Sequence, residues 1–319
     1  MTDLAAAYAE CRRINARHGR SYYLATLLLP PPKRPAIHAL YALARVADDI
    51  VDEPGHDPAT RLDELHQRLR DGDADPVITA ARDTIARWHI PWPLFDDFFA
   101  AMRMDLHVTS YGTWEDLLGY MHGSAAVIGL QTLPILEPLP GFADIAAPYA
   151  RDLGLGFQLT NFLRDVGEDL DRGRVYLPEE DLDRFGVNVG QLRQRVVDDR
   201  FRALLRFEID RARGLLATAA VGIRLLHPTS RDCVRTALAL YGGILDEIER
   251  ADYRVLDRRV SVGVARRAAL AATGVGRAWL ARRPHHTHQA SVCSTSEKPN
   301  ARSSIGAYST RGPRMSPVE

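Results

Sequence analysis

Two stretches of the sequence carry carboxylate side chains at a spacing that brings them onto one face of a helix. In the first stretch, Tyr41, Arg45, Asp48 and Asp52 recur every three or four residues. At about 100° per residue, these side chains fall within an arc of about 60°. Apolar residues border the same arc, so the acids lie toward the buried side of the helix. Carboxyl groups held there are expected to retain their protons unless a cation lies between them.

The second stretch repeats this arrangement with amides added to the acids. Gln158, Asn161, Asp165 and Asp169 occupy an arc of about 80° on a helix. Both stretches offer only oxygen ligands, and oxygen-only sites with few carboxylates suit Mg2+, which completes its shell with water and substrate phosphates. Neither stretch has the DxDxDG spacing of a calcium loop, and His and Cys ligands for zinc are missing nearby.

Each stretch alone could be an ordinary solvated helix face with ion pairs such as Arg45 to Asp49. Two oxygen-rich faces on separate helices, however, can face each other across a cavity. Such a pair would bind an anionic diphosphate through several Mg2+ ions and neutralise it as a leaving group.

The composition excludes several classes of protein. The 319 residues carry 41 Lys and Arg against 41 Asp and Glu, a balance that argues against nucleic acid as the main partner. Cys11, Cys233 and Cys293 are widely spaced and odd in number, which argues against a disulfide framework and favours a reducing, cytoplasmic location. We expect no signal peptide, and the apolar runs are far shorter than the roughly 20 residues that span a bilayer.

Apolar residues at three- and four-residue spacing predict an all-α protein, with a single helical domain over residues 1–283. Gly123 and Gly129 would let a neighbouring element approach closely, and Thr113 with Asp116, and Ser230, look like helix starts. From residue 284 to 319 the periodicity is lost, and Ser, Thr, Pro and Arg predict a disordered tail. The predicted helices cover residues 5–17, 34–53, 58–70, 75–88, 94–108, 113–136, 143–170, 197–226, 229–252 and 261–282.

Four segments carry a resemblance to a known family. They are GRSYYLATLLLPPPKRPAIHALYALARVADDIVDE, YMHGSAAVIGLQTLPIL, GLGFQLTNFLRDVGEDLDRGRVYLPEEDL and YGGILDEIERADYRVLDRRVSV. They resemble the signature regions of the squalene/phytoene synthase family, and their residues are most similar to those of its bacterial phytoene synthases. The resemblance covers roughly residues 5–283 and implies one isoprenoid-synthase-like helical bundle around a deep apolar cavity.

The resemblance also implies roles for individual residues. The family's metal-binding positions are matched by Asp48, Asp52, Gln158, Asn161, Asp165 and Asp169. Positions that bind and steer diphosphate are matched by Tyr41 and Arg45, and the C-terminal positions that contact it by Tyr241 and Arg259. The family's N-terminal flap is matched by Ser21 and Tyr22. Tyr22 and Tyr241 could instead be core aromatics, and Arg259 a solvated charge. The cavity wall would include Phe157, Phe162, Leu159 and Val127.

The implied reaction is the Mg2+-dependent, head-to-head condensation of two geranylgeranyl diphosphates to phytoene, with Mn2+ as a substitute ion and without NADPH. Squalene or dehydrosqualene synthesis from farnesyl diphosphate is the alternative, and a noncatalytic scaffold ranks below both. Because substrate and product are lipophilic, transient contact with the inner face of a membrane is expected. Tyr22 to Leu29 with Lys33 and Arg34 could make that contact or pack against the bundle. The sequence leaves the oligomeric state open.

Overall fold

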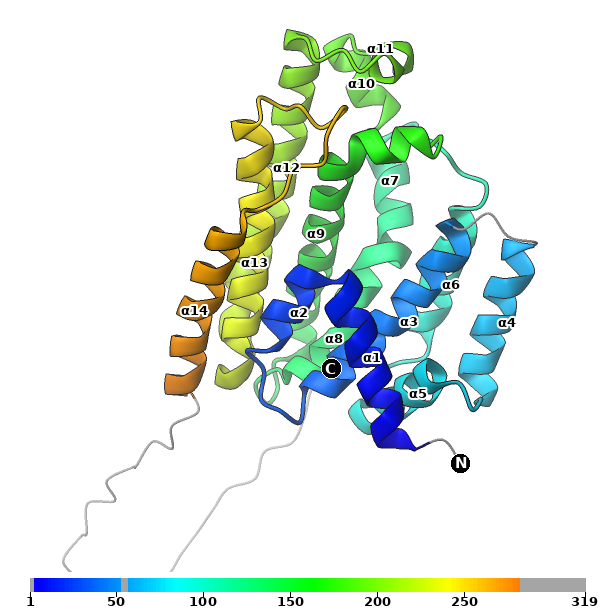
Figure 1. The fold of residues 1–319 in the computed structure, drawn as a ribbon, viewed down its shortest axis with the longest axis vertical. Coiled ribbons are helices and arrows are strands. Elements are labelled where there is room, and N and C mark those ends of the chain that lie inside the picture. The colour runs from blue at the N-terminus through cyan, green and yellow to red at the C-terminus, as the bar shows by residue number, and fades with distance from the viewer. Residues whose placement is uncertain (1–2, 53–56, 282–319) are drawn as a thin grey trace, which may run out of the picture. The chain divides into compact units, whose positions relative to one another are not determined.

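The computed structural model describes residues 3–52 and 57–281, and this part of the chain is helical with no β-strand (Figure 1). A π-helical turn, His122–Ala126, joins α7 to α8, and a short 3-10 turn, Ile223–Leu225, follows α12. The α-helices are α1 (Leu4–His18), α2 (Arg20–Thr26), α3 (Arg34–Asp52), α4 (Pro58–Asp71), α5 (Pro76–Trp88), α6 (Pro93–Met104), α7 (Trp114–Met121), α8 (Val127–Leu136), α9 (Ala143–Asp171), α10 (Glu179–Phe185), α11 (Val189–Arg193), α12 (Asp199–Gly222), α13 (Pro228–Arg250) and α14 (Val264–Ala281).

The predicted fold class is confirmed, and the differences lie at helix ends and in short helices. The range predicted as one helix over 113–136 divides at the π-helical turn, and α2, α10 and α11 were not predicted. Thr113 begins α7 with the predicted capping box to Asp116. The prediction for Ser230 is wrong, because α13 begins at Pro228 and the buried Ser230 hydroxyl accepts a hydrogen bond from Lys33 Nζ at 2.9 Å.

Contacts divide the chain into two units, Met1–Arg283 and Pro284–Glu319. The predicted disordered tail falls on the second unit, which lies outside the described residues.

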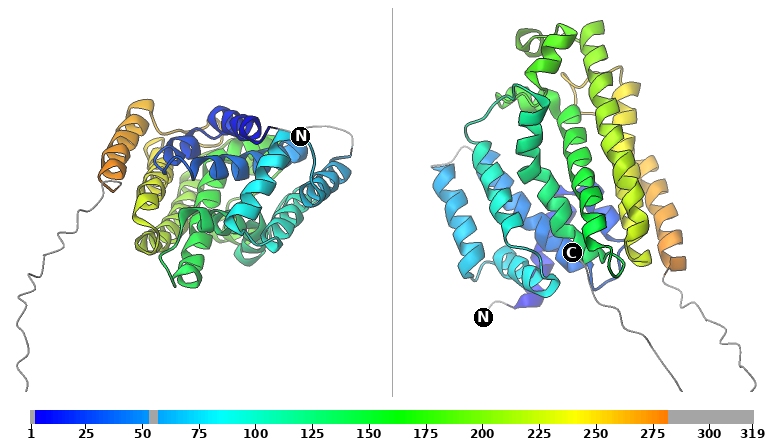
Figure 2. Two further views of the ribbon diagram at one scale, coloured as in Figure 1. Left: turned by 90° about the horizontal axis from the view of Figure 1, so that it is seen from below. Right: turned by 180° about the vertical axis from the view of Figure 1, so that it is seen from behind.

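The long helix α9 lies at the centre of the bundle and packs against α8, α12 and α13 (Figures 1 and 2). Its middle turns are buried on more than one side, since Leu155, Phe157, Leu159, Phe162 and Leu163 are all nearly inaccessible to water. Each such side chain contributes about 1.5–3 kcal/mol through burial. The acidic face of α9 is therefore carried on one of the most firmly packed elements of the fold.

The predicted close approach at Gly129 is present, and α9 is the element that makes it. A Cβ atom at Gly129 would lie 2.0 Å from the carbonyl oxygen of Ala150 on α9. The reverse approach, from α9 toward the π-helical turn, is just as close, since a Cβ at Gly154 would lie 2.3 Å from the carbonyl oxygen of Ala125. The backbones of α9 and of the π-turn and α8 thus touch directly, which fixes α9 against this wall of the bundle.

The segment from Tyr22 to Leu29 packs against the bundle, the second of the two expectations for it. Leu28 and Leu29 are buried, and Lys33 is 5% exposed with its ammonium group 2.6 Å from a Glu137 carboxylate oxygen. Among helices in residues 3–52 and 57–281, none combines the length and apolar character that a membrane span requires.

Candidate active site

The C-terminal half of α3 carries the first acidic face. Asp48 is half-buried, and its carboxyl group makes no hydrogen bond or ion pair with any residue that the structure describes. Burial raises its pKa to about 7, repulsion from Asp52 adds to the rise, and Arg45 partly offsets both. The sequence prediction of a carboxyl group driven toward protonation is therefore confirmed for Asp48, with burial as the larger cause.

Arg45 pairs with Asp49 on the same helix, as the solvated-face interpretation expected. Its Nε, however, is buried and has no hydrogen-bond partner among the described residues. A buried guanidinium N–H without an acceptor is costly. It would be satisfied by an anionic oxygen arriving at this face.

The C-terminal half of α9 carries the second acidic face. Asp169 is 8% exposed and, like that of Asp48, its carboxyl group has no hydrogen-bond or ion-pair partner in the described part of the chain. Burial and then the charge of Asp165 raise the pKa of Asp169 to about 7. Asp165 differs, because it accepts a hydrogen bond from Arg164 Nε at 2.7 Å and pairs with Arg259 Nε at 3.0 Å.

Arg259 reaches this face because the segment after α13 lies directly on α9. Gly167 makes that contact possible, since a Cβ there would lie 2.4 Å from the carbonyl oxygen of Leu256. The amide N–H of Gly167 donates to the carbonyl oxygen of Val255 at 3.2 Å. The Arg259 side chain is half exposed, but it also lies 3.3 Å from a Glu168 carboxylate oxygen, so it is an ion-paired residue of the site and not a free surface charge.

Arg174 connects the two acidic faces. Its Nη1 donates to Asp52 Oδ1 at 2.9 Å, and its charge also lowers the pKa of Asp169 against the effect of burial. Arg172 lies 3.5 Å from the other Asp52 oxygen. Arg174, the third residue after α9, therefore links the two acidic faces, because its guanidinium binds Asp52 and its amide N–H donates to the Asp169 carbonyl oxygen at 2.8 Å. The family resemblance included this segment, but the sequence analysis assigned Arg174 no role.

An aromatic layer lies beside the acids. The rings of Phe157 and Tyr241 stack at 3.9 Å, and Tyr22 lies 6.0 Å from Tyr41 and 5.8 Å from Tyr241 between ring centres. Burial raises the pKa of Tyr241, and the charge of Arg164 and the neighbouring Tyr22 and Asn161 side chains act against that rise. Burial raises the pKa of Tyr41 to about 12, so its hydroxyl stays protonated at neutral pH. Tyr22 and Tyr241 are thus both core aromatics and neighbours of the acids.

An apolar cavity of about 120 Å³ extends from this layer toward the opposite end of the bundle. Tyr22, Phe157 and Gln158 line it near the acids, and Leu136 and Val234 line it farther away. Ligand pockets commonly measure about 300–1,000 Å³. This cavity is smaller than that range.

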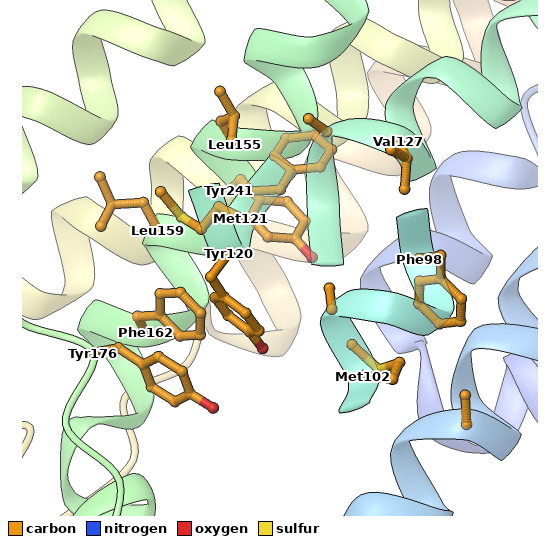
Figure 3. Packing of buried hydrophobic residues seen from close by; sticks show 14 of the residues in the cluster. Phe98, Met102, Tyr120, Met121, Val127, Leu155, Leu159, Phe162, Tyr176 and Tyr241 are labelled. Carbon is orange, nitrogen blue, oxygen red and sulfur yellow. The ribbon is translucent and has the colours of Figure 1, made fainter. Parts of the chain in front are cut away.

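Of the four predicted wall residues, only Phe157 lines this cavity. Val127, Leu159 and Phe162 pack in the surrounding core instead, where Figure 3 shows Phe162 ring to ring with Tyr176. The helical period places a residue on a side of the helix, but does not tell whether that side meets a cavity or another helix.

Sequence reasoning also missed Asp105, which is 9% exposed and follows α6. Its carboxylate accepts hydrogen bonds from the Tyr120 hydroxyl at 2.6 Å and the Tyr176 hydroxyl at 3.2 Å, and its carbonyl oxygen accepts from Arg174 Nη2 at 3.3 Å. Burial nevertheless raises the Asp105 pKa. Asp105 thus holds Arg174 and the segment around Tyr176 in place. The sequence carries no signal of this role, because Asp105 is a single acid that belongs to no repeating pattern of acids.

Ser21 is the predicted residue with the weakest link to the site. It lies near the start of α2, half-buried, and no hydrogen bond joins its hydroxyl to another residue of the described ranges.

The residues present fit a divalent cation and an anionic ligand. Within residues 3–52 and 57–281, no three His, Cys, Asp or Glu side chains already lie together as a closed metal site. The unpaired carboxyl groups of Asp48 and Asp169, with the unsatisfied Arg45 Nε, are instead what a metal-bound diphosphate would need. Asp52 and Asp165 would first have to exchange their arginine partners.

Comparisons with known proteins agree with this architecture. The sequence matches the family described as squalene/phytoene synthase over residues 15–266. It is 41% identical over 276 residues to the 15-cis-phytoene synthase of Synechocystis sp., covering 80% of each chain. Its fold is similar to that of a dehydrosqualene synthase solved with a ligand, with a TM-score of 0.79, 29% identity and coverage of 86% of this chain and 96% of the other. A squalene synthase of Alicyclobacillus acidocaldarius gives a TM-score of 0.71 and 30% identity, over 78% of this chain and 95% of the other.

Proposed function

This chain belongs to the squalene/phytoene synthase family, and from that premise we propose that it condenses two geranylgeranyl diphosphates head to head into phytoene. The observation that carries the proposal is the meeting of two acidic helix faces around Arg174, beside an aromatic layer and an apolar cavity. The 41% identical relative named as a phytoene synthase supports the C20 substrate and a role in carotenoid biosynthesis.

Asp48, Asp52, Gln158, Asn161, Asp165 and Asp169 would hold Mg2+, or Mn2+ in its place. Bound there, the ion would neutralise charge on the departing diphosphate. The chain itself supplies the anion contacts, because Arg45 has a free buried N–H and Arg259 can turn from Asp165 to a phosphate oxygen.

The reaction requires two ionisations in a dry pocket. In the first, the C1–O bond of one substrate breaks, diphosphate leaves, and the double bond of the second molecule attacks the allylic cation. Loss of a proton then gives a cyclopropylcarbinyl diphosphate. Its ionisation, rearrangement and loss of another proton give phytoene and the second diphosphate.

The aromatic layer serves these steps in two ways. The stacked faces of Phe157 and Tyr241 can stabilise a neighbouring carbocation, and the apolar cavity keeps water from capturing it. Each released proton can pass to departing diphosphate oxygen. Tyr41 is an alternative acceptor only if its phenol first loses its own proton, which its raised pKa disfavours.

Product identification tests the proposal against its alternatives. Purified protein is incubated with Mg2+ and either geranylgeranyl or farnesyl diphosphate, with and without NADPH, and the hydrocarbon is identified. We expect phytoene from the C20 substrate without NADPH. A C30 hydrocarbon from farnesyl diphosphate would instead support the activities named for the two solved relatives. Unchanged cellular function of an Asp48→Ala variant would support a noncatalytic scaffold.

We also propose a cytoplasmic protein that contacts the inner face of the membrane transiently. A substrate with a long apolar chain, and a hydrocarbon product, have to be collected from and returned to an apolar phase.

A further inference from the structure

The start of α9 and the end of α12 lie at the same end of the bundle (Figures 1 and 2). Large apolar side chains of both segments are exposed there. Phe142 is 40% exposed, Ile145 is 53% exposed and Val221 is 46% exposed. We call these three residues the basal patch. The two segments are joined by a hydrogen bond from Leu139 N to the Leu225 carbonyl oxygen at 2.7 Å, so the patch belongs to an ordered surface.

Residues close in the chain to Ile145 and Val221 belong to a buried apolar core. A second hydrophobic core lies at this end and includes Leu136, Ala146, Ile223 and Val234. Leu136 and Val234 also line the cavity. The second core thus lies between two features: Ala146 and Ile223 are close in the chain to patch residues, and Leu136 and Val234 form part of the cavity wall.

Basic groups without carboxylate partners flank the basal patch. Arg224 is exposed at the end of α12, and Arg231 donates to the carbonyl oxygens of Leu226 and Arg224, both at 2.9 Å. Neither guanidinium pairs with an acid in the described part of the chain. Asp144, in the first turn of α9, is an opposing charge, whereas Glu137 is neutralised by Lys33.

Exposed apolar side chains beside unpaired arginines match the interface of a bilayer that contains anionic phospholipid. We propose that the basal patch docks on such a bilayer, so that the second core separates the cavity from the acyl chains. The choice of a lipid occupant over a protein rests partly on the proposed function, because a hydrocarbon product must leave into an apolar phase.

Vesicle flotation of the full chain tests docking without any catalytic step. Vesicles of phosphatidylcholine alone are compared with vesicles that also contain phosphatidylglycerol. We expect the wild type to float with the mixed vesicles, and Phe142→Ser with Ile145→Ser to weaken binding by about tenfold or more. The matched control is Val196→Ser, because Val196 is 42% exposed in the loop between α11 and α12.

Two charge variants sharpen the test. Arg224→Gln with Arg231→Gln should remove the preference for phosphatidylglycerol, and Asp144→Asn should strengthen binding to the mixed vesicles. Wild type that fails to float, or a Phe142→Ser/Ile145→Ser variant that floats like wild type, overturns the proposal. Condensation measured in detergent micelles reports separately on the proposed function, and there the double variant should match the wild type.

Discussion

The four aspartates of the site fall into two pairs with different surroundings. Asp52 and Asp165 are ion-paired with arginines, whereas Asp48 and Asp169 are not paired and have raised pKa values. An unpaired carboxyl group in a buried position is unfavourable for folding. Such groups lie on both helices, half-buried at Asp48 on α3 and buried at Asp169 on α9, and the cation that we propose to bind with the substrate would satisfy them.

The matched substitutions Asp169→Asn and Asp171→Asn test this at the residue scale. Both residues lie in the last turn of α9, but the side chain of Asp171 is 72% exposed and pairs with Arg195. We expect Asp169→Asn to lower kcat about 10²–10³-fold, the usual loss when a charge-stabilising group is removed. Asp171→Asn should stay within about threefold of wild type. Equal losses in steady-state product formation would contradict the role of Asp169.

The Asp169 pKa of about 7 also predicts how stability depends on pH without added metal. Because the pKa is raised in the folded state, the stabilising effect of the protonated carboxyl group is full below about pH 4 and is lost as pH rises through 7. Denaturant unfolding should therefore show the advantage of Asp169→Asn over wild type growing between about pH 4 and pH 7 and levelling off above that range. If the free energies of unfolding of the variant and the wild type differed by a constant amount across that range, the Asp169 pKa would not be raised in the folded state.

At the scale of elements, the contact between α9 and the π-turn fixes the position of the second acidic face. A Cβ at Gly154 would lie 2.3 Å from a backbone carbonyl oxygen, which cannot move away as a flexible side chain could. By contrast, a Cβ at Gly119, which is exposed on α7, would have no atom within 4 Å.

Gly154→Ala should consequently lower the free energy of unfolding by about 1–3 kcal/mol or more. Gly119→Ala should raise it by about 0.5–1 kcal/mol, since alanine favours the helix without a clash. Urea denaturation of both variants measures the two effects. A stabilised Gly154→Ala would show that α9 can shift without cost.

At the scale of the whole molecule, the features that arise from helical periodicity could be predicted from the sequence. The long helices and the acidic faces of α3 and α9 were predictable because their signals repeat over several turns. The short helices α2, α10 and α11 give few turns of pattern, and α2 carries a run of apolar residues that equally fits a membrane contact.

The parts of the site that were missed depend on long-range contacts. Arg174 and Asp105 are 69 positions apart, and their roles arise only when the segments after α6 and α9 meet. Likewise, the size of the cavity depends on how Tyr22, Phe157 and Tyr241 pack, which no local pattern encodes.

The central claim is that acids from two distant helices jointly bind a metal-associated diphosphate. Titration calorimetry with inorganic diphosphate tests it directly on wild type, Asp48→Asn and Asp169→Asn, each with and without Mg2+. We predict that Mg2+ strengthens binding to the wild type, and that either substitution alone removes this enhancement. The claim would be contradicted if Mg2+ did not change the affinity of the wild type for diphosphate, or if Mg2+ still raised the affinity of both variants.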